Sequence, residues 1–190
     1  MFYGPPGTGK TLVVRAIASE TRSVLFDLSP ISIDGIFSAT KNETDKMIAM
    51  TMFAAKEYQP SIIYIDEAER IWPTKSKKKG KKAKKSKKTD LSNPVRIKKT
   101  LTKWKPKWIT EDTRITIIGC SNEPHELSKK EIKKFFDKSI YFPFPDYSTR
   151  RLMWRTFIEN HGGRLNSDFP LSTLSHISEG YSAGSIKMTV

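Results

Sequence analysis

The chain has 190 residues, of which 37% are hydrophobic, and a formal net charge of +14. This length and apolar content suffice for one α/β domain with a small helical piece, and they exclude an intrinsically disordered protein. The single cysteine, Cys120, excludes an intramolecular disulfide framework, and no stretch is long and apolar enough for a signal peptide or a membrane span. We therefore expect a protein of the reducing cytoplasm that has no membrane partner.

The first elements of the chain predict a phosphate-binding site. Residues 1–3 are apolar and predict a strand, and periodic apolar side chains predict a helix over 10–20. The loop between them fits the pattern Gly, four residues, Gly-Lys-Ser/Thr; it consists of Gly4, Pro5, Pro6, Gly7, Thr8, Gly9, Lys10 and Thr11. Glycines let backbone N–H groups converge on phosphate oxygens. Lys10 would reach the β and γ phosphates, and Thr11 would offer its hydroxyl to Mg²⁺. The alternative is a Gly/Pro-rich turn that matches the pattern by chance, but such a turn would not require a strand before it and a helix after it.

The next elements predict a buried strand that ends in two carboxylates. A strand is expected over 24–28 and a helix over 43–56, with Asn42 as its cap and with Ile48, Met52 and Ala55 on one stripe. The apolar, mostly β-branched residues 62–65 predict a strand buried on both faces, as in a parallel sheet. Ligands bind beyond the carboxyl ends of such strands, so Asp66 would help hold Mg²⁺ and Glu67 would polarise a water. The alternative is an exposed acidic pair that opens a helix.

A basic segment follows that strand. Ten of the fourteen residues in 75–88 are lysines, and none is acidic. Like charges repel one another and do not bury, which predicts a solvated insertion. Three interpretations stay open: a solubilising loop, a contact for an acidic polymer such as tubulin tails, and a nuclear-localisation or nucleic-acid patch.

The second half of the chain predicts further strands and then a helical region. Asn93 and Pro94 would open a helix with Ile97, Leu101 and Trp104 on its apolar stripe, where packing is a better interpretation of Trp104 and Trp108 than base stacking. Strands are expected over 115–118 and 139–142, with a short helix over 129–136 between them. Alternating strands and helices predict a doubly wound parallel sheet over 1–145. After residue 146 the pattern is helical. The three histidines lie far apart at no metal-ligand spacing, so we expect no zinc site.

Several of these segments resemble the AAA+ ATPases. The resemblance covers 4–11 (Walker A), 62–69 (Walker B), 119–124 (first sensor), 136–146, and 180–184, which is similar to the start of a helix in a small C-terminal lid. It implies a P-loop AAA+ large subdomain over 1–145 that carries the insertion, a partial helical lid over 146–190, and ATP and Mg²⁺ as ligands. It also implies that Asn122 orients the attacking water together with Glu67. Part of the adenine pocket is expected upstream of residue 1.

A narrower resemblance concerns the segments 25–30, 59–61, 94–101 and 145–150. They are similar to the IQ and AAA domain-containing family, which includes a subunit of the nexin-dynein regulatory complex. This resemblance implies a cytoskeletal location in the axoneme of a cilium or flagellum. It favours tubulin or axonemal proteins over nucleic acid as partners of the basic insertion.

The sequence leaves the enzymatic activity open. AAA+ rings hydrolyse ATP when a neighbouring subunit inserts arginines from just before the fifth strand, but that position holds Lys133 and Lys134. Lysine lacks the planar fork of arginine. Phe37 lies near the pore-loop aromatic of AAA+ unfoldases, yet we expect it to pack in the core. The hypotheses are a slow Mg²⁺-dependent ATPase, a structural module that binds ATP without hydrolysis, and a remodelling or microtubule-severing motor.

Overall fold

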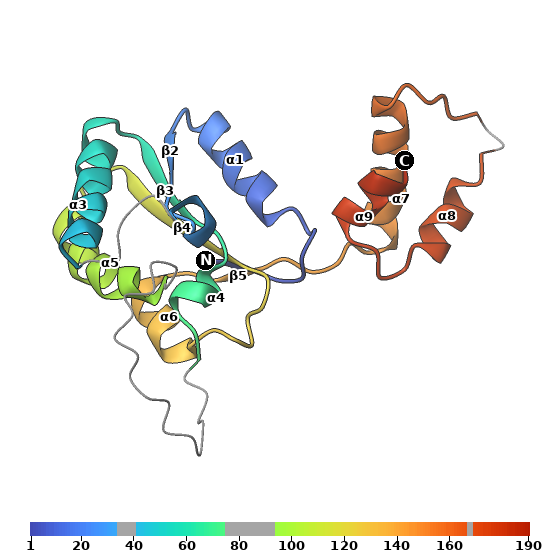
Figure 1. Ribbon diagram of the computed structural model, residues 1–190. Helices are drawn as coiled ribbons and strands as arrows, with labels where there is room; N and C mark the ends of the chain where they lie inside the picture. Colours follow the sequence, from blue (N-terminus) through green and yellow to red (C-terminus); the bar gives the residue numbers. More distant parts are fainter. Residues whose placement is uncertain (34–40, 75–93, 167–168) are drawn as a thin grey trace, which may run out of the picture.

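The computed structural model describes residues 1–33, 41–74, 94–166 and 169–190 (Figure 1). The described strands are β1 (Phe2–Tyr3), β2 (Val24–Asp27), β3 (Ser61–Ile65), β4 (Ile115–Ser121) and β5 (Ile140–Tyr141). The described helices are α1 (Lys10–Glu20), α2 (Pro30–Ile33), α3 (Lys41–Glu57), α4 (Ala68–Ile71), α5 (Val95–Trp108), α6 (Lys129–Phe135), α7 (Tyr147–Asn160), α8 (Leu171–Ile177) and α9 (Ala183–Thr189). None of these helices is long and apolar enough to cross a membrane. The predicted basic insertion at 75–88, the cap at Asn93 and the core position of Phe37 lie outside the described residues.

The five strands form one parallel sheet in the order β2-β3-β4-β1-β5. All five residues of β3 are buried, and their side chains alternate between the two faces of the sheet. Ile62 and Tyr64 pack with α1 on one face, whereas Ile63 and Ile65 pack with the helices α3 to α6 on the other. Helices thus cover both faces (Figure 1), and the predicted doubly wound α/β fold is confirmed.

The apolar stripes of the long helices are confirmed. Ile48, Met52 and Ala55 of α3 are fully buried, and α5 buries Ile97 and Leu101. Trp104 and Trp108 pack against the same core cluster, as the packing interpretation expects. The cap prediction for α3 is wrong: the helix begins at Lys41, so Asn42 lies inside its first turn.

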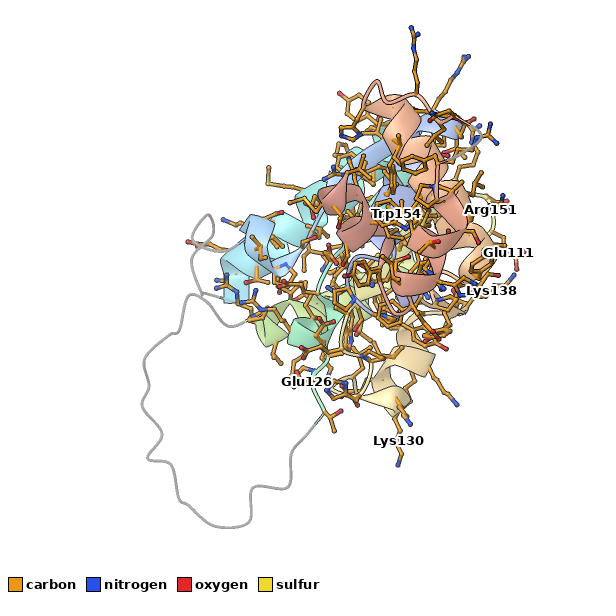
Figure 2. The ribbon with its side chains drawn as sticks, turned by 90° about the vertical axis from the view of Figure 1, so that its right-hand side faces the viewer. Glu111, Glu126, Lys130, Lys138, Arg151 and Trp154 are labelled. Atoms are coloured by element: carbon orange, nitrogen blue, oxygen red, sulfur yellow. The ribbon has the colours of Figure 1, made fainter. Side chains whose placement is uncertain are left out.

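The structure adds two four-residue helices: α2, which the sequence did not predict, and α4, which begins after Glu67 as the alternative interpretation of the acidic pair expects. Both begin three residues after a strand ends and are too short to show a periodic apolar pattern. After β5, the helices α8 and α9 both pack on α7. Trp154 of α7, labelled in Figure 2, is buried and donates a hydrogen bond to Ser178 Oγ at 3.1 Å.

Candidate nucleotide-binding site

The loop between β1 and α1 depends on three glycines with positive φ. Gly7 and Gly9 have φ of +75° and +91°, in the left-handed region that L side chains rarely adopt, and Gly4 has φ of +152°. A Cβ at Gly4 would lie 2.2 Å from the Phe142 carbonyl oxygen. The loop therefore runs close to neighbouring backbone, and α1 begins at Lys10 directly behind it.

Lys10 lies against the loop that precedes it. Its ammonium donates hydrogen bonds to the carbonyl oxygens of Gly4 at 2.9 Å and Pro5 at 2.6 Å. The side chain is buried, and this burial lowers the pKa of the ammonium. The negative charges of nearby groups, Asp66 and Glu69 among them, oppose that shift. The loop therefore holds a positive charge at its centre.

Asp66, directly after β3, meets Thr11 at the start of α1. Thr11 Oγ1 lies 3.3 Å from Asp66 Oδ2, and the Tyr64 hydroxyl lies 2.7 Å from the same carboxylate oxygen. The other oxygen, Oδ1, accepts a hydrogen bond from the Glu67 amide at 2.9 Å, and the Asp66 amide donates to Ser29 Oγ at 2.8 Å. Backbone and side-chain bonds thus fix the carboxylate beside the threonine hydroxyl. Burial, followed by the bond to Asp66, raises the pKa of Tyr64.

The predicted water-handling residues, Glu67 and Asn122, lie at the ends of adjacent strands. Glu67 is half-buried with φ of +47°, an uncommon conformation for a residue with a side chain, and such conformations cluster at functional sites. Its carboxylate pairs with Arg70 at 2.9 Å. Asn122 follows β4, whose last residue, Ser121, accepts a hydrogen bond from the Gly4 amide at 3.2 Å. Within the described ranges no hydrogen bond joins Glu67 to Asn122.

These residues fit a magnesium–nucleotide complex. Mg²⁺ prefers oxygen ligands, and the Thr11 hydroxyl and the Asp66 carboxylate supply two that lie side by side. A glycine-rich loop that ends at a helix N-terminus, with a lysine inside it, suits phosphate groups. A hollow of about 300 Å³ adjoins the loop, and it is lined mainly by Thr8, Phe144, Asp146, Thr149, Met153 and Ala183.

Part of the site comes from the C-terminal helices. The Gly184 amide of α9 donates to the Gly7 carbonyl at 3.0 Å, and a Cβ at Gly7 would lie 2.5 Å from Ser182 Oγ. Nothing local in the sequence links Ser182 or Gly184 to a loop so distant in the chain, so these contacts carry no sequence signal. Tyr64 does carry one, because the period of two along β3 places it on the same face as Asp66.

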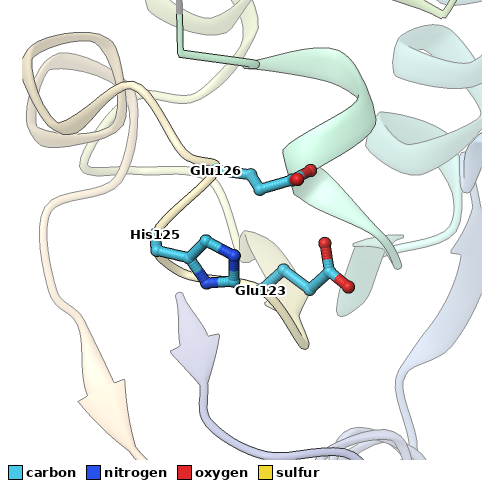
Figure 3. Close-up of side chains that lie close together, drawn as sticks. All are labelled: Glu123, His125 and Glu126. Atoms are coloured by element: carbon cyan, nitrogen blue, oxygen red, sulfur yellow. The ribbon is translucent and has the colours of Figure 1, made fainter.

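The loop after Asn122 carries a small cluster of ionisable side chains. The ligand atoms of Glu123, His125 and Glu126 lie within 4.8 Å of one another, and all three side chains are exposed (Figure 3). A turn holds them, since the Glu126 amide donates to the Glu123 carbonyl at 3.0 Å. Exposed groups of this kind are common on protein surfaces without an ion.

Comparisons with known proteins agree with this geometry. The family model described as "ATPase family associated with various cellular activities (AAA)" matches residues 1–144. The chain belongs to the AAA family. Among curated AAA relatives, mouse "Dynein regulatory complex protein 11" is 30% identical over 195 residues, which cover 100% of this chain and 22% of the relative. "Spastin" of Xenopus tropicalis is 30% identical over 186 residues, with 98% of this chain and 28% of the relative covered.

Solved AAA domains have the same fold. The FIGL-1 AAA domain in complex with ADP superposes with a TM-score of 0.72 at 22% identity, covering 98% of this chain and 56% of that one. The chain spans about a quarter of the length of the curated relatives that it matches.

Proposed function

We propose that this AAA domain binds Mg²⁺·ATP and hydrolyses it slowly to ADP and phosphate. The observation that carries the proposal is the meeting of Thr11 and Asp66, 3.3 Å apart, beside a glycine-rich loop whose centre holds the Lys10 ammonium. Phosphate-loop ATPases need these three groups together, because they bind the phosphates and the metal ion.

Each residue of the proposed site has one task. The loop amides and Lys10 bind the β and γ phosphates, and Thr11 and Asp66 hold the metal, which when bound neutralises charge on the phosphates. Glu67 accepts a proton from the attacking water, and Asn122 orients that water. Glu67 must leave Arg70 for this task; both side chains are partly exposed, so their ion pair holds Glu67 only weakly. The hollow beside Thr8 and Phe144 receives the base.

The turnover is proposed to be slow because of the residues at the end of α6. Lys133 and Lys134 are exposed there, where the family resemblance places the arginines that reach a neighbouring active site. A missing arginine finger costs about 10³-fold or more in systems that depend on it. Lysine supplies charge but not a bidentate fork.

The lysines in place of arginines at the end of α6 also favour a second candidate, a structural module that binds ATP without hydrolysing it. In both cases we propose a role in the axoneme of a cilium or flagellum, as part of a dynein regulatory complex. The support for that role is the similarity to the mouse protein named for the complex, which extends over the whole of this chain.

One experiment separates the two candidates. ATP binding and phosphate release are measured for the wild type, Lys10→Ala and Glu67→Gln. Both candidates predict that Lys10→Ala abolishes binding while Glu67→Gln retains it. Only the ATPase predicts phosphate release by the wild type above the level of Glu67→Gln. If the wild type does not bind ATP, both candidates are wrong.

A further inference from the structure

The phenol of Tyr64 touches both of the proposed metal-holding residues. Tyr64 lies on β3, is 6% exposed, and faces α1. Its hydroxyl lies 2.7 Å from Asp66 Oδ2 and 3.1 Å from Thr11 Oγ1. The two contacts reach residues 2 and 53 positions away in the chain, so the phenol bridges β3 and the start of α1.

A buried phenol needs a hydrogen-bond partner, and one bond to Asp66 would satisfy that need. Packing alone therefore does not explain why the hydroxyl also lies beside Thr11. The ring of Tyr64 packs against α1 and against neighbouring strands of the sheet. A phenylalanine at this position would bury the same ring. What tyrosine adds at this place is the single oxygen atom between Thr11 and Asp66.

The protons of the three groups favour one arrangement. A phenol carries one proton, and the 2.7 Å bond to an ionised carboxylate is the shorter and stronger of its two contacts, so Tyr64 donates to Asp66. Thr11 donates its own proton to the same carboxylate oxygen at 3.3 Å, and its oxygen lies 3.1 Å from the phenol. A threonine hydroxyl that donates to Asp66 keeps a lone pair for a metal ion, and a lone pair is what a metal ligand must offer.

We propose that Tyr64 is a positioning residue: it holds the Asp66 carboxylate where that group accepts the proton of Thr11, so that the Thr11 oxygen is oriented for Mg²⁺ binding. This inference rests on the proposed function, since it concerns the same metal-dependent site. In this role Tyr64 acts through Thr11 and Asp66 rather than on the phosphates or the metal itself. Its effect is confined to the dependence of nucleotide binding on Mg²⁺.

The test is Tyr64→Phe, which keeps the ring and removes the oxygen. ADP and ATP binding are measured by titration calorimetry in EDTA and at increasing Mg²⁺. We expect unchanged nucleotide affinity in EDTA and about a tenfold increase in the Mg²⁺ concentration for half-maximal enhancement of binding, the size of one hydrogen bond to a charged group. Tyr58→Phe is the control, because Tyr58 is 64% exposed and precedes β3, whereas Asp66 follows the other end of that strand.

The outcomes distinguish failure of the proposed function from failure of the role of Tyr64. If the wild type binds no nucleotide, the proposed function fails. If the wild type shows Mg²⁺-enhanced binding and Tyr64→Phe has the same Mg²⁺ dependence, the role of Tyr64 is wrong. Equal losses with and without Mg²⁺ also contradict it, because they indicate a general disturbance of the core. Tyr64→Met, which fills the space without a donor, carries the same test if the phenylalanine variant does not fold.

A double variant tests whether Tyr64 acts through Thr11. Thr11→Ala removes the hydroxyl that the phenol is proposed to orient. We expect Tyr64→Phe to raise the Mg²⁺ requirement much less in the Thr11→Ala background than in the wild type, because coupled residues are non-additive. Fully additive effects would overturn the proposed orientation of Thr11.

Discussion

The amide of Gly184, in the first turn of α9, donates a hydrogen bond to the carbonyl of Gly7 at 3.0 Å. The C-terminal helices thus contact the phosphate loop directly, at a glycine whose φ of +75° is one that L side chains rarely adopt. Ser182, which caps α9 by accepting from the Ser185 amide, is the side chain nearest to that glycine. The conformation of the loop and the position of α9 therefore depend on each other.

Gly7→Ala should weaken nucleotide binding for this reason. The new Cβ would lie 2.5 Å from Ser182 Oγ, and the left-handed backbone would be strained by about 1–3 kcal/mol. We expect about ten- to hundredfold lower ATP affinity, measured by titration calorimetry.

Gly162→Ala is the matched control for Gly7→Ala. Gly162 has φ of +84°, but nothing lies within 4 Å of its Cβ position. It therefore suffers the same backbone strain without displacing α9. Equal losses of ATP affinity in the two variants would show that the contact with α9 does not matter.

Met52→Ala should destabilise the part of the protein that is formed by the sheet and its covering helices. Met52 is fully buried between α3 and the sheet, and removal of a buried methionine side chain costs about 2–5 kcal/mol. Met50 lies on the same helix and is 70% exposed, so Met50→Ala should change the free energy of unfolding by less than about 0.5 kcal/mol. Urea denaturation measures both values. Similar values for the two variants would contradict the packing of α3.

The elements predicted well from sequence share a physical cause. The strand β3 is a run of apolar residues that follows Pro60 and Ser61 and ends before Asp66, and α1 starts where a glycine-rich loop ends, so both have strong local signals. The four residues of α2 are too few to show periodicity, and Asn42, a residue type favoured at caps, lies inside the first turn because α3 begins at Lys41.

The same distinction applies to the candidate site: local patterns predict some of its residues, whereas others are brought there by tertiary packing. Thr11 and Asp66 were predicted to share a metal because a loop motif and a strand end imply that they meet, and the structure places them 3.3 Å apart. The contact of Gly184 with Gly7 joins segments at opposite ends of the chain, and only the packing of α9 creates it. Local pattern therefore identifies groups with known chemistry, whereas the contacts that position them arise from tertiary structure.

Cys120 should be inert toward thiol reagents in the folded protein. It is fully buried on β4, and burial raises its pKa to about 12. Because the thiolate is the nucleophile, neither access nor ionisation favours reaction at neutral pH. We expect maleimide to label Cys120 only as fast as the protein unfolds. Mass spectrometry measures the rate of labelling.

The control for Cys120 is an accessible thiol in the same chain. Met188 is 87% exposed, so Met188→Cys in a Cys120→Ala background should label at the rate of a free thiol. Labelling of native Cys120 at a comparable rate would mean that β4 is far more open than the structure shows.

Asp146 should stabilise α7 in a pH-dependent way. Its carboxylate caps the helix by accepting from the Thr149 amide at 2.8 Å and from Ser148 Oγ at 3.0 Å. The bonds from Thr149 and Ser148 lower its pKa below the ordinary value of 3.8. A lowered folded-state pKa means that the stabilisation is complete above pH 3.8 and is lost as the pH falls through the folded value.

Two substitutions isolate this effect. Asp146→Ala should be less stable than the wild type at pH 7, whereas Asp146→Asn should be close to it, because asparagine caps helices equally well without a charge. As the pH falls below 3.8, the wild type should lose its greater stability relative to Asp146→Ala, whereas Asp146→Asn should stay more stable than Asp146→Ala. The amide NMR signal of Thr149, which reports the titration of the carboxylate directly, should shift with a midpoint below 3.8. A midpoint at or above that value would show that Asp146 is not ionised preferentially by its place at the start of α7.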